Sequence, residues 1–350
     1  MKHTLTLMAA LLLATRHDVN AAGDTPQIKL PLVGLVQMGD IGFHRQDGGL
    51  AYPELGDLRR FPGIFGGTVI NITWEQLEPQ RGVLKTKEID HVLEEIRAYN
   101  RANPQHPLGA RLRVWPGPNA PVWAKNLGGR PVAIRHKDMP LTVGRFWSKP
   151  YRDAWRELQV KLAVRYETEP LIREVSNTSG ASMTDESILL PGDSESVKNM
   201  RAAGFTDRQF QVCLLESPAD YAGWISTRVE LVCNPYRAID SGKTKPDMEF
   251  TFKLMRHWRQ TLGARGVFSN HALNQPAEHA DIYDEMRRVG PPTAFQTHSP
   301  NGLDWEGALQ LGRSYGAGSI ELWTGTKFGG FETKSQQLLR QWAALFNSEK

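Results

Sequence analysis

The chain has 350 residues, of which 40% are hydrophobic and 23% charged, with 10 Trp and a formal net charge of +4. This composition excludes an intrinsically disordered chain, because such chains are poor in apolar residues and rich in net charge. The 42 Lys and Arg slightly outnumber the 38 Asp and Glu and form no long basic run. This small excess of positive charge is weak evidence for nucleic-acid binding and mild evidence for an acidic ligand.

The first 22 residues have the features of a secretory signal peptide. Lys2 and His3 precede an apolar run over residues 5–14, and the small residues Ala21 and Ala22 offer a cleavage site. The run is too short to cross a bilayer, and no later stretch reaches the roughly 20 apolar residues of a membrane helix. We expect a signal peptide at 1–22 and a secreted or periplasmic mature chain at 23–350, with a buried N-terminal helix as the alternative.

From residue 30 onward, short apolar runs alternate with amphipathic segments, as in βα units with parallel strands. Eight strands are predicted, over residues 32–38, 67–73, 110–115, 171–178, 228–234, 266–272, 293–299 and 319–323. Six helices are predicted, over residues 89–99, 151–166, 206–224, 248–262, 305–315 and 334–346. Residues 179–204, rich in Gly, Ser and Asp, are predicted to form a long functional loop.

Eight strands, most of them followed by helices, favour an α/β fold with a single (β/α)8 TIM barrel. The alternative is an open doubly wound sheet, but no Gly-rich phosphate-binding turn follows the first strand. No linker or shift in composition marks a second domain. The oligomeric state is left open.

The loops at the carboxyl ends of the strands build the functional site of such a barrel. Aromatic, amide and carboxylate side chains dominate there, and this set suits a sugar, whose ring stacks on Trp and whose hydroxyl groups bond to Asn, Gln, His and Arg. The candidate substrate-binding residues are Arg113, Trp115, Asn119, Trp123, Asn177, Asn234, His271, Gln296, His298 and Trp323. Packing is the alternative role for the Trp and His side chains.

The motifs of several other enzyme classes are missing. No His-Glu-x-x-His, Cys-x-x-Cys or calcium-loop pattern is present, so we expect no metal and no other cofactor. No Gly-x-Ser-x-Gly elbow supports a serine hydrolase. Hydrolysis by two carboxyl groups, one protonated and one ionised, is the chemistry that remains. Cys213 and Cys233 are compatible with one disulfide or with two buried thiols.

Three segments carry recognisable motifs. Residues 73–83 read Thr-Trp-Glu-Gln-Leu-Glu-Pro-Gln-Arg-Gly-Val, residues 113–123 read Arg-Val-Trp-Pro-Gly-Pro-Asn-Ala-Pro-Val-Trp, and residues 319–323 read Ser-Ile-Glu-Leu-Trp. They resemble the segments at strands two, three and eight of the retaining (β/α)8 glycoside hydrolases of clan A, which include β-galactosidase-like members. The resemblance covers most of residues 30–345. It implies cleavage of an oligosaccharide or polysaccharide, and a structural role for Glu78 in the Leu-Glu-Pro turn.

The chain departs from this group at both catalytic positions. Clan A enzymes carry an acid/base Glu after an Asn at the end of strand four and a nucleophilic Glu on strand seven. Here Thr178 follows Asn177, and residues 293–298 contain no carboxylate. We therefore expect the loop residue Glu186 to be the catalytic acid and Glu321 on strand eight to be the second catalytic carboxyl. The resemblance favours retention of configuration.

Each acid also has a structural interpretation. Glu186 lies in a polar loop, where an acid is often solvated or caps a turn. Glu321 lies inside a strand, where a carboxylate needs a partner such as Arg113. Glu174 and Glu230 are expected to be ion-paired. The missing strand-seven Glu leaves open a second function, a barrel that binds carbohydrate without cleaving it.

Overall fold

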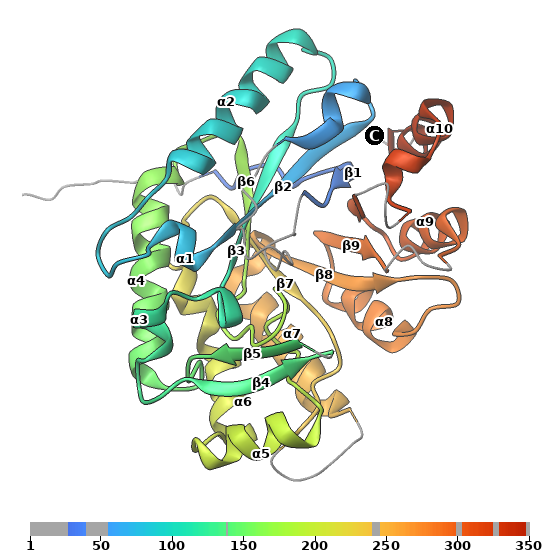
Figure 1. Ribbon diagram of the computed structural model, residues 1–350. Coiled ribbons are helices and arrows are strands. Elements are labelled where there is room, and N and C mark those ends of the chain that lie inside the picture. The colour runs from blue at the N-terminus through green and yellow to red at the C-terminus, as the bar shows by residue number, and fades with distance from the viewer. Residues whose placement is uncertain are drawn as a thin grey trace, which may run out of the picture.

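Eight parallel strands close into a barrel that helices surround (Figure 1). The computed structural model describes residues 27–39, 55–137, 139–239, 246–298, 303–324 and 329–347. The barrel strands are β1 (Gly34–Gln37), β2 (Phe65–Thr73), β3 (Gly109–Trp115), β6 (Ile172–Ser176), β7 (Arg228–Val232), β8 (Gly266–Leu273), β9 (Thr293–Thr297) and β10 (Ser319–Leu322). They pair in this order, and β10 returns to β1. The predicted TIM barrel is confirmed, and the open sheet is excluded by this closure.

The helices bury one face each against the barrel. Along α2, Ile89, Val92, Leu93 and Ile96 are buried at helical spacing, which explains why this segment forms an outer helix. The main helices are α2 (Lys87–Ala102), α4 (Lys149–Tyr166), α5 (Ser194–Ala202), α6 (Asp207–Glu216), α7 (Met248–Leu262), α8 (Ala280–Val289), α9 (Trp305–Ser314) and α10 (Gln336–Asn347). Within the described ranges, no helix is long and apolar enough to cross a membrane.

Several elements differ from the predictions, and α8 lies where no helix was predicted. The segment predicted as one long loop contains α5, which Asp193 caps by accepting a hydrogen bond from the Ser196 amide. An antiparallel hairpin, β4 (Val132–His136) and β5 (Met139–Val143), lies between β3 and α4. The helix predicted over 206–224 ends at Glu216, because Pro218 cannot continue it, and a 3-10 turn over Ser217–Tyr221 follows. The predicted signal peptide lies outside the described residues.

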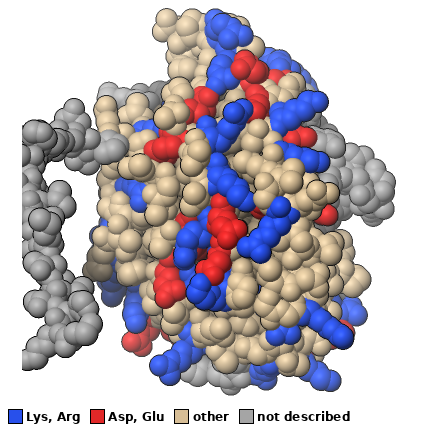
Figure 2. Space-filling model, turned by 90° about the vertical axis from the view of Figure 1, so that its left-hand side faces the viewer, with Lys and Arg blue, Asp and Glu red and all other residues tan. Residues whose placement is uncertain are grey.

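The face that carries α2 and α4 is covered with charges of both signs (Figure 2). Most of them are paired: Arg165 lies 2.8 Å from Asp90, and Arg81 lies 3.3 Å from Glu157. Exposed pairs of this kind each contribute at most about 1 kcal/mol to stability. This face is therefore close to neutral and is an ordinary solvent-exposed surface.

The two cysteines, Cys213 and Cys233, are free and buried. Of the two possibilities that the sequence left open, the structure has two buried thiols and no disulfide.

Candidate active site

The interior of the barrel contains a cluster of buried charges, which we call the interior charge network: Arg111, Arg113, Glu174, Glu230 and Glu321. Most barrels of this type are filled by branched apolar side chains. In this barrel the separate apolar cluster is small and consists of Leu32, Val36 and Val69, and the interior also contains these buried charges. Buried charges are costly unless they are paired and hydrogen-bonded, so the partners of each group decide what the network can do.

Strand β3 supplies both cations of the network. Arg111 and Arg113 are two residues apart, so they lie on the same, inward face of the strand. The Arg111 guanidinium lies 2.6 Å from a carboxylate oxygen of Glu174 and 2.6 Å from one of Glu230. Glu230 also accepts a 2.6 Å hydrogen bond from the Ser176 hydroxyl. The expected ion pairing of Glu174 and Glu230 is confirmed.

Glu321 is held by both guanidinium groups. Arg113 donates hydrogen bonds of 2.9 and 2.8 Å to its two carboxylate oxygens, and Arg111 donates one of 3.1 Å. Only 1% of Glu321 is exposed. This is the ion pair that the sequence offered as the structural alternative for Glu321. Arg113 is itself fully buried and engaged, so its predicted direct contact with a sugar is corrected to the role of holding carboxylates inside the barrel.

Two acids from the loop after β6 lie at the carboxyl end of the barrel. Asp185 lies 3.0 Å from the Arg113 Nε atom, so the same guanidinium touches both Asp185 and Glu321. Next to it, Glu186 accepts a 2.7 Å hydrogen bond from the Asn234 amide, just after β7, and one of 3.1 Å from the Thr184 hydroxyl. The loop thus brings Glu186 to the same end of the barrel as Glu321.

The surroundings of Glu186 favour its protonated form. Burial raises the pKa of Glu186, and the nearby His271 charge and the two hydrogen bonds only partly oppose this rise. An acid that keeps its proton near neutral pH can give it to a leaving group. The direction of this shift is the one that a proton donor requires.

His271 connects the loop acids to the interior network. Its Nδ1 atom lies 3.6 Å from Asp185 and its Nε2 atom 3.8 Å from Glu230. Burial lowers the pKa of His271, but the nearby carboxylates of Glu230 and Asp185 outweigh burial, and the pKa is raised. Burial opposes ionisation of Glu230 as well, and Arg111 and His271 reverse that effect, so the pKa of Glu230 is lowered.

The other predicted binding residues are distributed over the carboxyl end of the barrel. Asn177 follows β6 and donates a 3.0 Å hydrogen bond to Ser217, and the Trp115 indole donates one of 2.9 Å to Asn71. Gln296 lies on β9 in register with Glu321. Asn119 is buried in a 3-10 turn, whereas His298 and Trp323 are half-buried after β9 and β10.

Trp123 requires a correction. It lies on the short helix α3 (Val122–Lys125), and its ring packs edge-on against Trp74, which in turn contacts Tyr151 and Trp155 of α4. Its indole donates a 2.8 Å hydrogen bond to the Glu78 carbonyl. Trp123 therefore packs in the helical layer and does not join the residues around Glu186. Glu78 accepts hydrogen bonds from Trp74 and the Gly82 amide, in agreement with its expected structural role.

Sequence reasoning left Arg111 out of the site, and it counted Asp185 among the residues at the strand ends without giving it a role. The signal for Arg111 was available, because two Arg residues at alternate positions of a buried strand require acidic partners inside the barrel. The contact of Asp185 with Arg113 was harder to predict, since a loop acid beside Glu186 has no periodicity that shows which way it faces.

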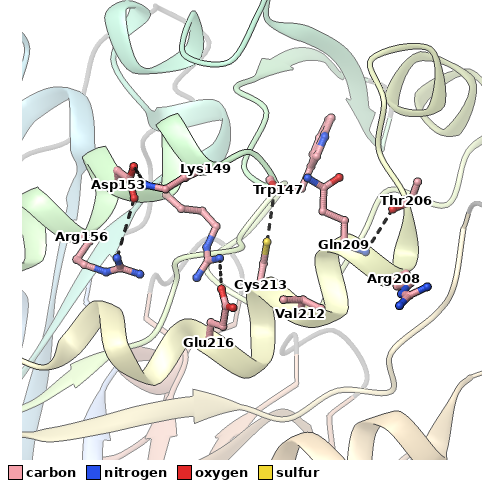
Figure 3. Close-up of a pocket in the computed structure, with 11 residues that line it drawn as sticks. Trp147, Lys149, Asp153, Arg156, Thr206, Arg208, Gln209, Val212, Cys213 and Glu216 are labelled. Atoms are coloured by element: carbon pink, nitrogen blue, oxygen red, sulfur yellow. Dashed lines mark hydrogen bonds and ion pairs between the residues drawn. The ribbon is translucent and has the colours of Figure 1, made fainter.

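A cavity of about 530 Å³ lies elsewhere, between α4 and α6 on the outer wall (Figure 3). The charges along it are largely paired: Arg152 lies 2.7 Å from Glu216, and Lys149 lies 2.5 Å from Asp153. The Cys213 thiol, which faces the cavity, donates to the Trp147 carbonyl. The cavity contains none of the predicted site residues, so it is separate from the candidate active site.

Comparison with known proteins places this geometry in context. No family model and no curated protein matches the chain. Among solved structures, an exo-beta-1,4-mannosidase from Opitutaceae bacterium strain TAV5 is 11% identical, with 91% of this chain and 60% of that chain covered and a TM-score of 0.51. A GH5_18 protein from Bifidobacterium longum, in complex with Manb1-4GlcNAc, is 14% identical, with coverages of 90% and 78% and a TM-score of 0.51.

The chain has the barrel fold of the clan A glycoside hydrolases. An endo-glycoceramidase II from Rhodococcus sp. also matches, at 16% identity, coverages of 85% and 75%, and a TM-score of 0.48. At these identities the likeness is one of fold. It agrees with the resemblance drawn from the three sequence segments, and the reaction has to be argued from the residues of this chain.

Proposed function

We propose that this protein is a glycoside hydrolase that cleaves a polysaccharide or oligosaccharide, with Glu186 as proton donor and Glu321 as the second carboxyl group. The observation that carries the proposal is the link through Arg113, whose guanidinium contacts Glu321 and Asp185, the residue next to Glu186. Two acids with contrasting surroundings at one end of a barrel are the arrangement that glycoside hydrolysis requires.

The division of labour follows from those surroundings. Glu186, whose pKa is raised by burial, gives its proton to the glycosidic oxygen as the bond to the anomeric carbon breaks. The Glu321 carboxylate forms a bond to that carbon or stabilises its positive charge, and water then completes hydrolysis. The hydrogen bond from Asn234 keeps the Glu186 carboxyl in a fixed orientation. Retention of configuration is the outcome that the resemblance to clan A favours.

A second candidate function is carbohydrate binding without cleavage. It is favoured by the state of Glu321, which is 1% exposed and engaged by two guanidinium groups. In clan A enzymes the seventh barrel strand supplies the nucleophile. The seventh barrel strand of this chain, β9, has no carboxylate and carries Gln296 in register with Glu321. In this alternative, the aromatic and amide side chains at the carboxyl end of the barrel retain their affinity for sugars.

Three variants separate the two functions. On a panel of bacterial and plant polysaccharides, hydrolysis predicts that Glu186→Gln and Glu321→Gln each lower kcat at least about 100-fold while glycan binding persists. Glu174→Gln is the matched control, because it removes a charge from the same network without touching either proposed catalytic group. Circular dichroism establishes that all three variants fold. Glycan binding without turnover by the wild-type protein would establish the binding function instead.

We also propose that the chain is exported. The charged start, short apolar run and small residues of the first 22 positions support this proposal. Amino-terminal sequencing of protein recovered from the periplasm or medium tests it, and export predicts a mature chain that begins near residue 23. Full-length protein confined to the cytoplasm would contradict it.

A further inference from the structure

The net positive charge of the chain comes from two segments beside the candidate site. Residues 116–148 and 193–202, which we call the basic arm, contain seven Lys and Arg but only three Asp and Glu. The remainder of the chain has 35 of each kind, so the basic arm accounts for the whole net charge of +4. A protein with a small overall charge thus has one markedly cationic region.

The basic arm is a defined structural unit. It comprises α3, the β4–β5 hairpin and α5, which lie together at one end of the barrel (Figure 1). Helix α5 covers the free edge of β4: the Ser196 hydroxyl accepts a 2.8 Å hydrogen bond from the Arg135 amide, and Asn199 donates one of 3.1 Å to the Ala133 carbonyl. These bonds hold the two segments, far apart in sequence, as one surface.

The basic arm adjoins the loops that carry the site. Its first part follows Trp115 at the end of β3, and its second part follows the loop that contains Glu186. The Thr178 hydroxyl, at the start of the second loop, donates a 2.6 Å hydrogen bond to the carbonyl of Val114 on β3. A carbon added to Gly117 would lie 2.7 Å from the Ala181 carbonyl oxygen, so the backbones are in direct contact there. The start of the basic arm therefore lies against the loop that contains Glu186.

Several of the cations are available to a ligand. Arg130, Lys137 and Lys198 are exposed, and no residue in the described part of the chain forms an ion pair with them. Arg135 is partly neutralised by Glu195, at 2.9 Å. On the α2 and α4 face, by contrast, most charges are matched by opposite ones. Unmatched cations on a surface attract anions over a distance set by the ionic strength.

We propose that the basic arm binds an anionic polysaccharide, one that bears carboxylate or sulfate groups, and presents it to the site around Glu186. This inference names the substrate class of the proposed function and rests on it. A saccharide is favoured over nucleic acid or a lipid surface because the cations adjoin a barrel end lined with aromatic and amide side chains. The carboxylate and sulfate groups would contact the basic arm while uncharged parts of the sugar contact those side chains.

Binding measurements on the full mature chain test the proposal. The probes are polygalacturonate for carboxylate, κ-carrageenan for sulfate, and uncharged galactan. At low ionic strength, about 0.01 M, where the Debye length is about 30 Å, we expect one or both anionic polymers to bind at least about tenfold more tightly than galactan. The triple variant Arg130→Gln, Lys137→Gln and Lys198→Gln should raise the Kd about tenfold, and added salt should have the same effect.

The control is a second triple variant with the same change in charge, Lys85→Gln, Lys87→Gln and Lys253→Gln, placed on exposed positions outside the basic arm. Its Kd should stay within about twofold of wild type. Equal losses in both triple variants, or equal binding of galactan, would overturn the proposal. Duplex DNA or phosphatidylglycerol vesicles that bind as tightly through the same three cations would also overturn it.

Failure of this inference is distinguishable from failure of the proposed function. Cleavage of an uncharged glycan by a protein that does not bind the anionic polymers would leave hydrolysis intact and remove the basic arm from substrate recognition. Specific anionic binding without cleavage, unchanged in the Glu186→Gln variant, would support the basic arm as a binding surface and favour the non-catalytic function.

Discussion

Glu321 illustrates how strongly a single residue depends on partners from distant parts of the chain. Its carboxylate accepts hydrogen bonds from both Arg111 and Arg113. Because only 1% of Glu321 is exposed, these two guanidinium groups take the place of water around its charge. The two guanidinium groups depend on it in return. Removing one member of a buried ion pair is far more costly than replacing the whole set, because the remaining charge stays buried without a counter-charge.

Replacement of Glu321 by Ala should therefore lower the free energy of unfolding by about 3–5 kcal/mol. Urea denaturation followed by circular dichroism measures this change. The matched control is Glu157→Ala, which removes a surface partner of Arg81 and should cost less than about 1 kcal/mol. Similar losses in the two variants would show that the interior pairing contributes no more than a surface pair.

Asp220 predicts a pH dependence of stability. Burial raises its pKa to about 6, against the opposing charges of Arg152 and Arg156. Between pH 4 and pH 6 the folded state holds a proton that the unfolded state has released, so the free energy of unfolding falls as pH rises through this window. The expected fall is on the order of 2–3 kcal/mol.

The variant Asp220→Asn should lose this dependence. The difference in unfolding free energy, wild type minus variant, should decrease between pH 4 and pH 7 by the same amount. Asp284→Asn, which alters a surface pair with Arg287, serves as the control. Parallel pH profiles for wild type and Asp220→Asn would contradict the expected titration.

Among the secondary structure elements, the sequence predicted the barrel strands well and the inserted elements poorly. Strands such as β3 and β9 are buried along their whole length, and the apolar residues that they carry between turn residues marked them as strands although polar residues interrupt them. The β4–β5 hairpin is short and contains Pro140, and α5 has nine residues with a polar surface. Their stability comes from contact with each other, which no local pattern encodes.

The site was predictable to a similar extent. Residues that directly follow strands, such as Asn177 and Asn234, were located by the rule that loops at the carboxyl ends of the strands build it. The orientation of Trp123 was not predictable, because the same Trp side chain suits a sugar and a packed aromatic cluster equally well. Packing against Trp74, 49 positions earlier in the sequence, decided it.

The contact between α5 and the hairpin yields a prediction for these elements. Ser196→Ala removes the hydroxyl that accepts the Arg135 amide hydrogen bond, which should weaken the local structure by about 1 kcal/mol. Hydrogen exchange at the Arg135 amide should then be roughly fivefold faster. Ser194→Ala, an exposed change on the same helix, should leave this rate unchanged. An unaltered rate in Ser196→Ala would mean that α5 does not hold the hairpin edge.

For the whole molecule, closure of the barrel is the property that depends on every strand. Strand β10 pairs with β9 on one side and with β1 on the other, and it also supplies Glu321. A closed sheet has no free edge, whereas a gap would expose two rows of unpaired backbone groups. Strand β1 thus needs β10 as the partner that pairs its backbone groups and closes the barrel.

Deletion of residues 319–350 should abolish cooperative unfolding, because it opens the sheet and leaves Arg113 without Glu321. Thermal denaturation followed by circular dichroism should show a broad, shallow change in place of one sigmoidal transition. Removal of residues 348–350 alone is the control and should preserve the transition. A cooperative melt for the longer deletion would show that seven strands are sufficient.

The pairing inside the barrel also constrains how the protein is made. Arg113 and its partner Glu321 are separated by 208 residues. On the ribosome, β3 therefore emerges long before Glu321. Until synthesis is nearly finished, the two guanidinium groups of β3 have only their other partners, Glu174, Asp185 and Glu230. Collapse before Glu321 is made would bury two guanidinium groups that lack one of their counter-charges. Chaperones that delay compaction of the emerging chain should accordingly raise the yield of native protein.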